Sequence, residues 1–167
     1  VCSGTAPCQI HHECSGKHAG FLTVNAHLAG HPDYEKPDHP VQKACLEAFE
    51  TVTGTTSPGF GIDGCSVPNF ATTLHGMGRA MAHFAAAPDG SAEARLHQAM
   101  RLHPDLVAGE TRACTNLMRA TNGKVALKTG AEGFFIAILP DQKIGVALKA
   151  ACGTKRAAEC AITSILV

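Results

Sequence analysis

Three short segments of the chain combine chemically reactive side chains with glycines, which let a backbone approach a ligand closely. The first is Cys14-Ser-Gly-Lys-His-Ala-Gly, the second is Asp63-Gly-Cys-Ser-Val-Pro, and the third is Lys128-Thr-Gly. Thiols and carboxylates are common zinc ligands, and a lysine amine can carry protons during catalysis. These residue types indicate a metal site, hydrolytic chemistry, or both.

Spacing within the first two segments leaves two interpretations open for each. Cys14 and Lys17 are three residues apart, so both side chains face one side if a helical turn begins here. The same segment is also typical of an ordinary helix N-terminus with Ser15 as its cap. Asp63 and Cys65 are two residues apart, which in an extended run turns both toward one face. An ordinary Asp-Gly turn before a helix fits them as well.

The third segment, Lys128-Thr129-Gly130, lies at the end of an expected strand over residues 125–128. Lys-Thr-Gly on an edge strand is a signature of serine hydrolases of the β-lactamase and penicillin-binding type. By itself the match is weak, because many strands end in this tripeptide by chance.

The hydrophobic periodicity predicts helices first and a small sheet afterwards. Apolar residues at spacings of three and four, ended by glycine or proline, predict helices over residues 19–28, 40–52, 70–84, 91–102 and 109–120. Beyond the Asn122-Gly123 turn, three short strands are expected at residues 125–128, 134–139 and 144–148, and a closing helix at residues 155–167. This order predicts an α+β fold, a small antiparallel sheet closed by a C-terminal helix.

Composition narrows the class of protein. At 167 residues a single domain over residues 1–167 is expected. Fourteen basic and fourteen acidic residues cancel, so no charge excess favours binding to nucleic acid or to a membrane surface. No run of 18 apolar residues exists to span a bilayer.

The eight cysteines allow either a disulfide framework or free thiols. We favour free thiols and a cytoplasmic location, because a chain of this size does not need disulfides to hold its core. Cys45, Cys114, Cys152 and Cys160 then serve as small buried apolar residues.

Taken together, in this order and at these distances, the three segments resemble the rhizobial-type L-asparaginases. The likeness runs from about Pro7 to the C-terminus and includes Val107-Ala-Gly-Glu-Thr-Arg and Gly145-Val-Ala-Leu-Lys. The resemblance implies a serine β-lactamase-like fold, a homodimer, and an amidohydrolase that converts L-asparagine to L-aspartate and ammonia through a serine–lysine acyl-enzyme.

The resemblance also assigns roles to residues of the three segments. It implies a zinc ion near the active centre, held by Cys14, Lys17 and Cys65. It places Asp63, His18 and Ser15 beside the substrate or the metal ligands. A catalytic role follows for the Lys-Thr-Gly motif, which here is Lys128, Thr129 and Gly130.

The likeness is incomplete at the nucleophile. The family's serine lies in a Ser-x-x-Lys motif upstream of the segment that begins near Cys14, and no Ser-x-x-Lys occurs in these 167 residues. Thr121-x-x-Lys124 is a loose match that we reject, because it lies in an expected turn. We therefore expect an internal fragment of a longer enzyme. Two alternatives stay open: a non-catalytic zinc-binding module, and a β-lactamase-like hydrolase of another amide.

Overall fold

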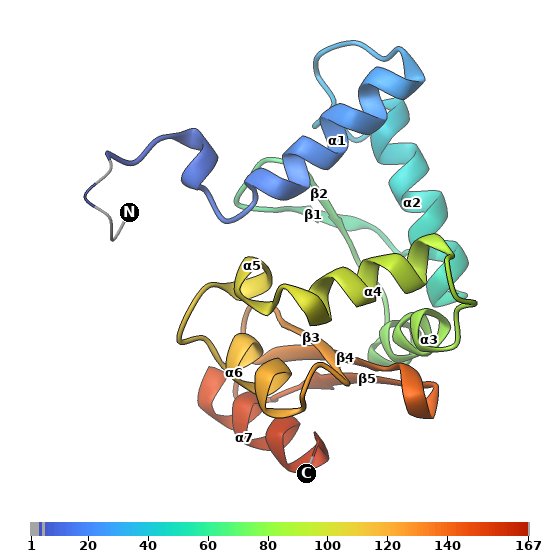
Figure 1. Cartoon of the computed structure of the whole chain (residues 1–167). Coiled ribbons are helices and arrows are strands. Elements are labelled where there is room, and N and C mark those ends of the chain that lie inside the picture. The colour runs from blue at the N-terminus through green and yellow to red at the C-terminus, as the bar shows by residue number, and fades with distance from the viewer. Residues whose placement is uncertain (1–3, 5, 167) are drawn as a thin grey trace. The chain divides into compact units, whose positions relative to one another are not determined.

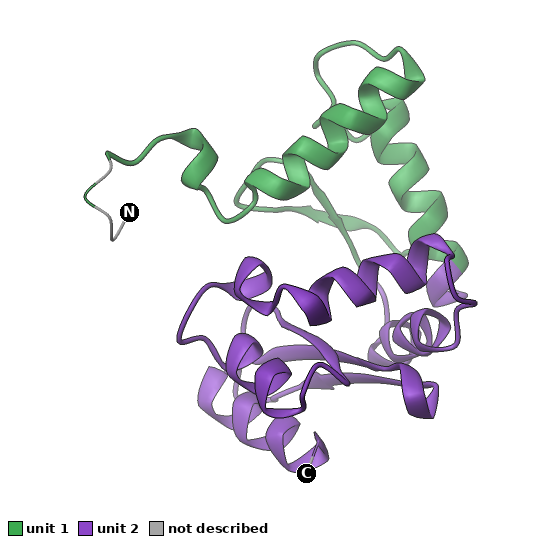
Figure 2. Ribbon diagram, viewed as in Figure 1, with its two compact units in different colours: residues 1–51, 56–71 green, residues 52–55, 72–167 purple. Residues whose placement is uncertain are grey.

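The computed structural model describes residue 4 and residues 6–166, which form two compact units (Figure 2). Unit 1 is Val1–Thr51 with Thr56–Ala71, and unit 2 is Val52–Thr55 with Thr72–Val167. The described residues contain seven α-helices and two small antiparallel sheets, which confirms the α+β class (Figure 1). The expectation of one domain and of a serine β-lactamase-like fold stays a prediction.

Two helices and a hairpin make up unit 1. After a short 3-10 turn, Gln9–His11, come α1 (Ser15–Leu28) and α2 (Pro40–Thr53), whose last two residues belong to unit 2. Strands β1 (Phe60–Ile62) and β2 (Pro68–Phe70) pair antiparallel, with Gly61 opposite Asn69. Pro40 begins α2, where its missing N–H costs nothing, and the His39 ring accepts the Val41 N–H at 3.0 Å.

The buried part of unit 1 lies between α2 and the hairpin. His39, Val41 and Gln42 at the start of α2 are buried, as are Val67 and Pro68 on the hairpin. The Gln42 amide Nε2 donates to the Tyr34 carbonyl oxygen at 2.8 Å and so joins α2 to the loop before it.

Unit 2 is a three-stranded antiparallel sheet covered by helices on both faces (Figure 1). Its strands, in the spatial order β3-β4-β5, are Ala126–Thr129, Phe134–Leu139 and Ile144–Lys149. The helices are α3 (Leu74–Ala85), α4 (Ala92–Leu102), α5 (Pro104–Ala108), α6 (Ala113–Ala120) and α7 (Lys155–Leu166). Among the described residues β3 pairs only with β4, so it is an edge strand.

Alternation along the strands separates two hydrophobic cores in unit 2. Leu127 and Phe135 pack with Met118 and Ile162, on the face covered by α6 and α7. Ala126, Ile136 and Ile138 turn to the other face and pack with α3 residues. α3 lies so close to β5 that a Cβ at Gly145 would overlap backbone atoms of α3, so only glycine fits there.

Most elements agree with the sequence predictions, with a few exceptions. Ser91 caps α4 by accepting the Ala94 N–H at 3.2 Å, as expected. α1 begins at Ser15, four residues earlier than predicted, and Phe70 belongs to β2 instead of the following helix. α5 was not predicted, because five residues are too few to show a helical period.

The burial predicted for four cysteines is correct only in part. Cys114 is 1% exposed, and Cys45 is half-buried. Cys152 and Cys160 are exposed, so their assignment as buried residues was wrong. α7 buries Ala158 and Ile162, which are four residues apart, and Cys160 between them lies on the outer side.

All seven cysteines in the described part of the chain are free thiols, and Cys2 lies outside it. None of the helices described is both long and apolar enough to cross a bilayer.

His97 on α4 gives the fold a dependence on pH. Its side chain is 5% exposed, and its Nδ1 has no partner among the described residues. Burial lowers the pKa of His97, the nearby Arg101 lowers it further, and Asp89 opposes both. Because the unfolded chain binds this proton more readily, stability is complete above about pH 6.5 and falls as the pH is lowered, by at most about 1.4 kcal/mol per pH unit.

We expect His97→Gln to reduce the fall in the free energy of unfolding at acidic pH. Urea unfolding between about pH 5 and 8, the range in which an ordinary histidine titrates, would measure it. His75 is exposed, so His75→Gln is the matched control and should leave the pH dependence of the unfolding free energy unchanged. An identical pH profile in the wild type and His97→Gln would contradict the prediction.

Candidate metal and hydrolytic site

The N-terminus of α1 and the turn of the β1–β2 hairpin bring four reactive side chains of unit 1 together. Cys14 is the N-cap residue of α1, and Lys17 lies in its first turn. Asp63 and Cys65 lie in the hairpin turn, which is closed by the Asp63 N–H donating to the Val67 carbonyl at 2.9 Å. The segments at residues 14–17 and 63–65, separated by 46 residues between Lys17 and Asp63, therefore meet in space.

The hairpin turn corrects one local expectation. Residues 63–65 do not form an extended run, because the Ser66 N–H donates to the Asp63 carbonyl at 2.9 Å and Ser66 has a φ of 71°. The Asp-Gly turn interpretation was right about the turn, although strand β2 and not a helix follows it. Asp63 and Cys65 nevertheless interact through their side chains, because the turn folds one toward the other.

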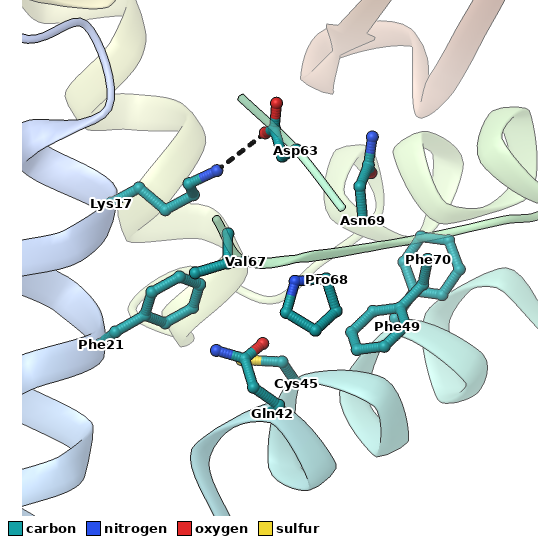
Figure 3. A pocket seen from close by; sticks show the side chains of 10 residues that line it. All are labelled: Lys17, Phe21, Gln42, Cys45, Phe49, Asp63, Val67, Pro68, Asn69 and Phe70. Atoms are coloured by element: carbon teal, nitrogen blue, oxygen red, sulfur yellow. Dashed lines mark hydrogen bonds and ion pairs between the residues drawn. The ribbon is translucent and has the colours of Figure 1, made fainter. Parts of the chain in front are cut away.

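An ion pair joins the two elements. Lys17 Nζ lies 3.1 Å from Asp63 Oδ2 (Figure 3). Hydrogen bonding from Lys17 lowers the pKa of Asp63, and the Gly64 N–H, 2.7 Å from Oδ1, lowers it further. Burial lowers the pKa of Lys17, but the contacts with Cys65 and Asp63 outweigh burial and raise it. Lys17 is therefore an ammonium group in this arrangement.

The two thiols complete the group. Burial raises the pKa of Cys14, interaction with Cys65 raises it further, and the charge of Lys17 opposes both. Neither cysteine is in a disulfide. The sulfur and nitrogen donors of Cys14, Cys65 and Lys17 are of the types that zinc accepts.

The lysine is essential to this donor set. No cluster of three or more His, Cys, Asp or Glu side chains able to hold a metal occurs among residue 4 and residues 6–166. A three-ligand site in this place therefore needs the Lys17 amine, which must first lose its proton. Subject to that step, the residues present fit a zinc ion.

The structure shows the contacts of His18 and Ser15, and their predicted place beside the substrate or the metal ligands stays a prediction. His18 Nδ1 is 2.7 Å from the Tyr34 hydroxyl, and the His18 ring also packs against Phe21. The imidazole is thus used to hold α1 on the loop before α2. Ser15 is the first residue of α1, and the cap position expected for it belongs to Cys14.

The Lys-Thr-Gly segment lies in unit 2 at the end of β3, as predicted, with Lys128 and Thr129 in the strand and Gly130 just after it; β3 is an edge strand. Lys128 is half-buried, and its Nζ donates to the Thr129 carbonyl at 2.8 Å. The Thr129 hydroxyl donates to the carbonyls of Gly130 and Phe134 at 3.2 and 3.3 Å. The lysine amine is therefore held against its own strand.

Cys114 is a neighbour of this motif that sequence reasoning missed. Its buried sulfur accepts the Thr129 N–H at 3.2 Å. That N–H lies on an edge strand, where the sheet supplies no second partner. The only signal in the sequence was the place of Cys114 on the apolar side of α6, which predicts burial but no contact.

A pocket of about 240 Å³ opens beside the Lys17–Asp63 pair, within unit 1 (Figure 3). Its walls are largely apolar and its rim is polar; the lining residues are Lys17, Phe21, Gln42, Cys45, Phe49, Asp63, Val67, Pro68, Asn69 and Phe70. Nothing in the sequence pattern pointed to it, because its residues come from three segments that only the fold brings together.

A family model described as L-asparaginase II matches residues 1–167. No curated protein matches the chain significantly.

Proposed function

Because the chain belongs to the L-asparaginase II family, we propose that it is part of an amidohydrolase that converts L-asparagine to L-aspartate and ammonia. The match over residues 1–167 is the observation that carries this proposal. Lys128-Thr129-Gly130 on an edge strand supports it, because serine hydrolases use this motif in the same place.

The proposed chemistry is acyl transfer through a serine. A serine oxygen attacks the side-chain amide carbon of asparagine, the C–N bond breaks, and the nitrogen leaves as ammonia after taking up a proton. Water then attacks the ester, which releases aspartate and returns the serine hydroxyl. Lys128 would move protons to and from a serine hydroxyl during these steps, and its contact with the Thr129 carbonyl limits where its amine can reach.

We propose that Cys14, Lys17 and Cys65 hold a zinc ion in unit 1. When bound, the ion would supply a fixed positive charge that orients the polar end of the substrate. Asp63 would keep its place through the Gly64 N–H after Lys17 has given up its proton, and so would remain a carboxylate beside the ligands. The homodimer implied by the family resemblance is likewise a proposal.

A second candidate function is a zinc-binding module without turnover. The convergence of Cys14, Lys17 and Cys65 in a chain with no Ser-x-x-Lys motif favours it. Hydrolysis of another amide on the same machinery is the third candidate.

A substrate panel distinguishes the three. The chain would be co-expressed with the Ser-x-x-Lys-bearing segment of another family member and assayed on asparagine, glutamine and a chromogenic β-lactam. Ammonia release from asparagine, with little from the other two, is the expected result. Zinc bound without turnover of any substrate would favour the module, and β-lactam turnover alone would favour the other hydrolase.

A further inference from the structure

Gln42 places a buried hydrogen-bond acceptor at the pocket of unit 1. Its side chain is 1% exposed. Since Nε2 donates to the Tyr34 carbonyl at 2.8 Å, the orientation of the amide is fixed and Oε1 must be the atom turned the other way. Oε1 has no hydrogen-bond partner among the described residues. Figure 3 shows this oxygen directed toward Cys45 and Pro68, which line the pocket.

An acceptor buried without a partner is unfavourable, and most such groups in native proteins are satisfied. Here the amide cannot turn to water without breaking its bond to Tyr34. Because Oε1 is itself covered, a donor reaches it only when the side chains that line the pocket move slightly apart; such a donor would satisfy Oε1, for which the described residues supply none.

The side chains that form the walls of the pocket determine which kind of ligand fits beside the donor group. The rings of Phe21, Phe49 and Phe70 lie around the pocket, together with the apolar surface of Pro68 (Figure 3). Aromatic walls favour an aromatic guest, which packs against them edge-on or offset. At the rim of the metal-free chain, Lys17 and Asp63 neutralise each other at 3.1 Å, so neither an anion nor a cation gains there.

We propose that this pocket binds a small, uncharged aromatic ligand with one hydroxyl group, whose O–H donates to Gln42 Oε1 and whose ring lies among the phenylalanines. Phenol is the simplest member of the class. The contacts that the ligand needs come from Gln42 and the phenylalanines, which belong neither to the zinc ligands nor to the Lys-Thr-Gly motif; Lys17 at the rim is shared with the proposed zinc site.

The first test compares two probes of nearly equal shape. Phenol and toluene would be titrated into the ¹⁵N-labelled chain and followed by amide chemical shifts. We expect saturable shifts around residues 42–49 with phenol, and binding about tenfold weaker in Gln42→Leu, which corresponds to one lost hydrogen bond. Toluene should bind wild type and Gln42→Leu with similar affinity. Gln98→Leu, an exposed position on α4, is the matched control and should bind phenol as the wild type does.

A second readout needs no substitution, so it holds even if Gln42→Leu fails to fold. Cys45 lines the pocket, whereas Cys152 is exposed in unit 2. Phenol at saturation should slow alkylation of Cys45 by iodoacetamide, mapped by mass spectrometry, and leave Cys152 unaffected. Three results would each overturn the proposal. The first is a set of amide chemical shifts that does not saturate with phenol, and the second is equal affinity for phenol in the wild type and a folded Gln42→Leu. The third is alkylation of Cys45 at the same rate with and without phenol.

Discussion

The 167-residue chain assayed by itself is expected to release no ammonia from asparagine at an enzymatic rate. The reason is the lack of a Ser-x-x-Lys nucleophile in its sequence, since neither Lys128 nor a bound metal can take over the covalent step. Loss of the nucleophile from a serine protease lowers turnover about a million-fold. Co-expression with the Ser-x-x-Lys-bearing segment of another family member should restore turnover, and a coupled ammonia assay would measure it.

Lys128→Ala in the restored enzyme should then remove most of the activity, by about 10²–10⁴-fold, the usual contribution of a positioned acid–base group. Lys124→Ala is the matched control and should leave the activity unchanged. A large loss of activity in this variant would mean that Thr121-x-x-Lys124 was wrongly rejected. Full activity of Lys128→Ala would remove the link to the Lys-Thr-Gly hydrolases and leave only a fold analogy.

Strong turnover by the chain alone would contradict the main expectation and require a nucleophile among its own serines. Ser15 would be the first to test, because it lies between Cys14 and Lys17. Ser57 is a poor candidate, since its hydroxyl is engaged by the carbonyls of Gly59 and Ala71, both at 2.8 Å. Ser3 lies outside the described residues.

Zinc binding should depend on the sulfurs of both Cys14 and Cys65. We expect about one zinc per chain, as catalytic sites with three protein ligands bind a single ion. Cys14→Ser and Cys65→Ser should each weaken binding by more than about 100-fold, because even a lost outer partner costs about 10–100-fold. Competition with a chromophoric chelator would measure the affinities, and the exposed Cys152→Ser should bind as the wild type does.

The pH dependence of zinc binding follows from the raised pKa values of Cys14 and Lys17. Both groups hold their protons at neutral pH, so the ion must displace them, and the apparent affinity should rise with pH. An affinity unchanged by pH, or unchanged in both cysteine variants, would rule out this donor set.

Local sequence patterns were sufficient to predict most of the helices and the family. The spacing in α2 and α3, the Ser91 cap and the Asn122-Gly123 turn are local features, because each depends on residues within one or two helical turns. The family could be inferred for a similar reason: its three motifs are each contiguous, and the match over residues 1–167 confirms what they indicated.

Which side chains meet became visible only in the folded chain. The Lys17–Asp63 pair joins residues 46 positions apart, and the contact between Cys114 and Thr129 joins two elements of unit 2. A periodic pattern shows which side of a helix is apolar, but not what packs against it. Burial depends on the neighbouring element, and the folding of the whole unit determines which element that is. For this reason Cys160 was wrongly assigned to the core, and the pocket of unit 1 could not be predicted.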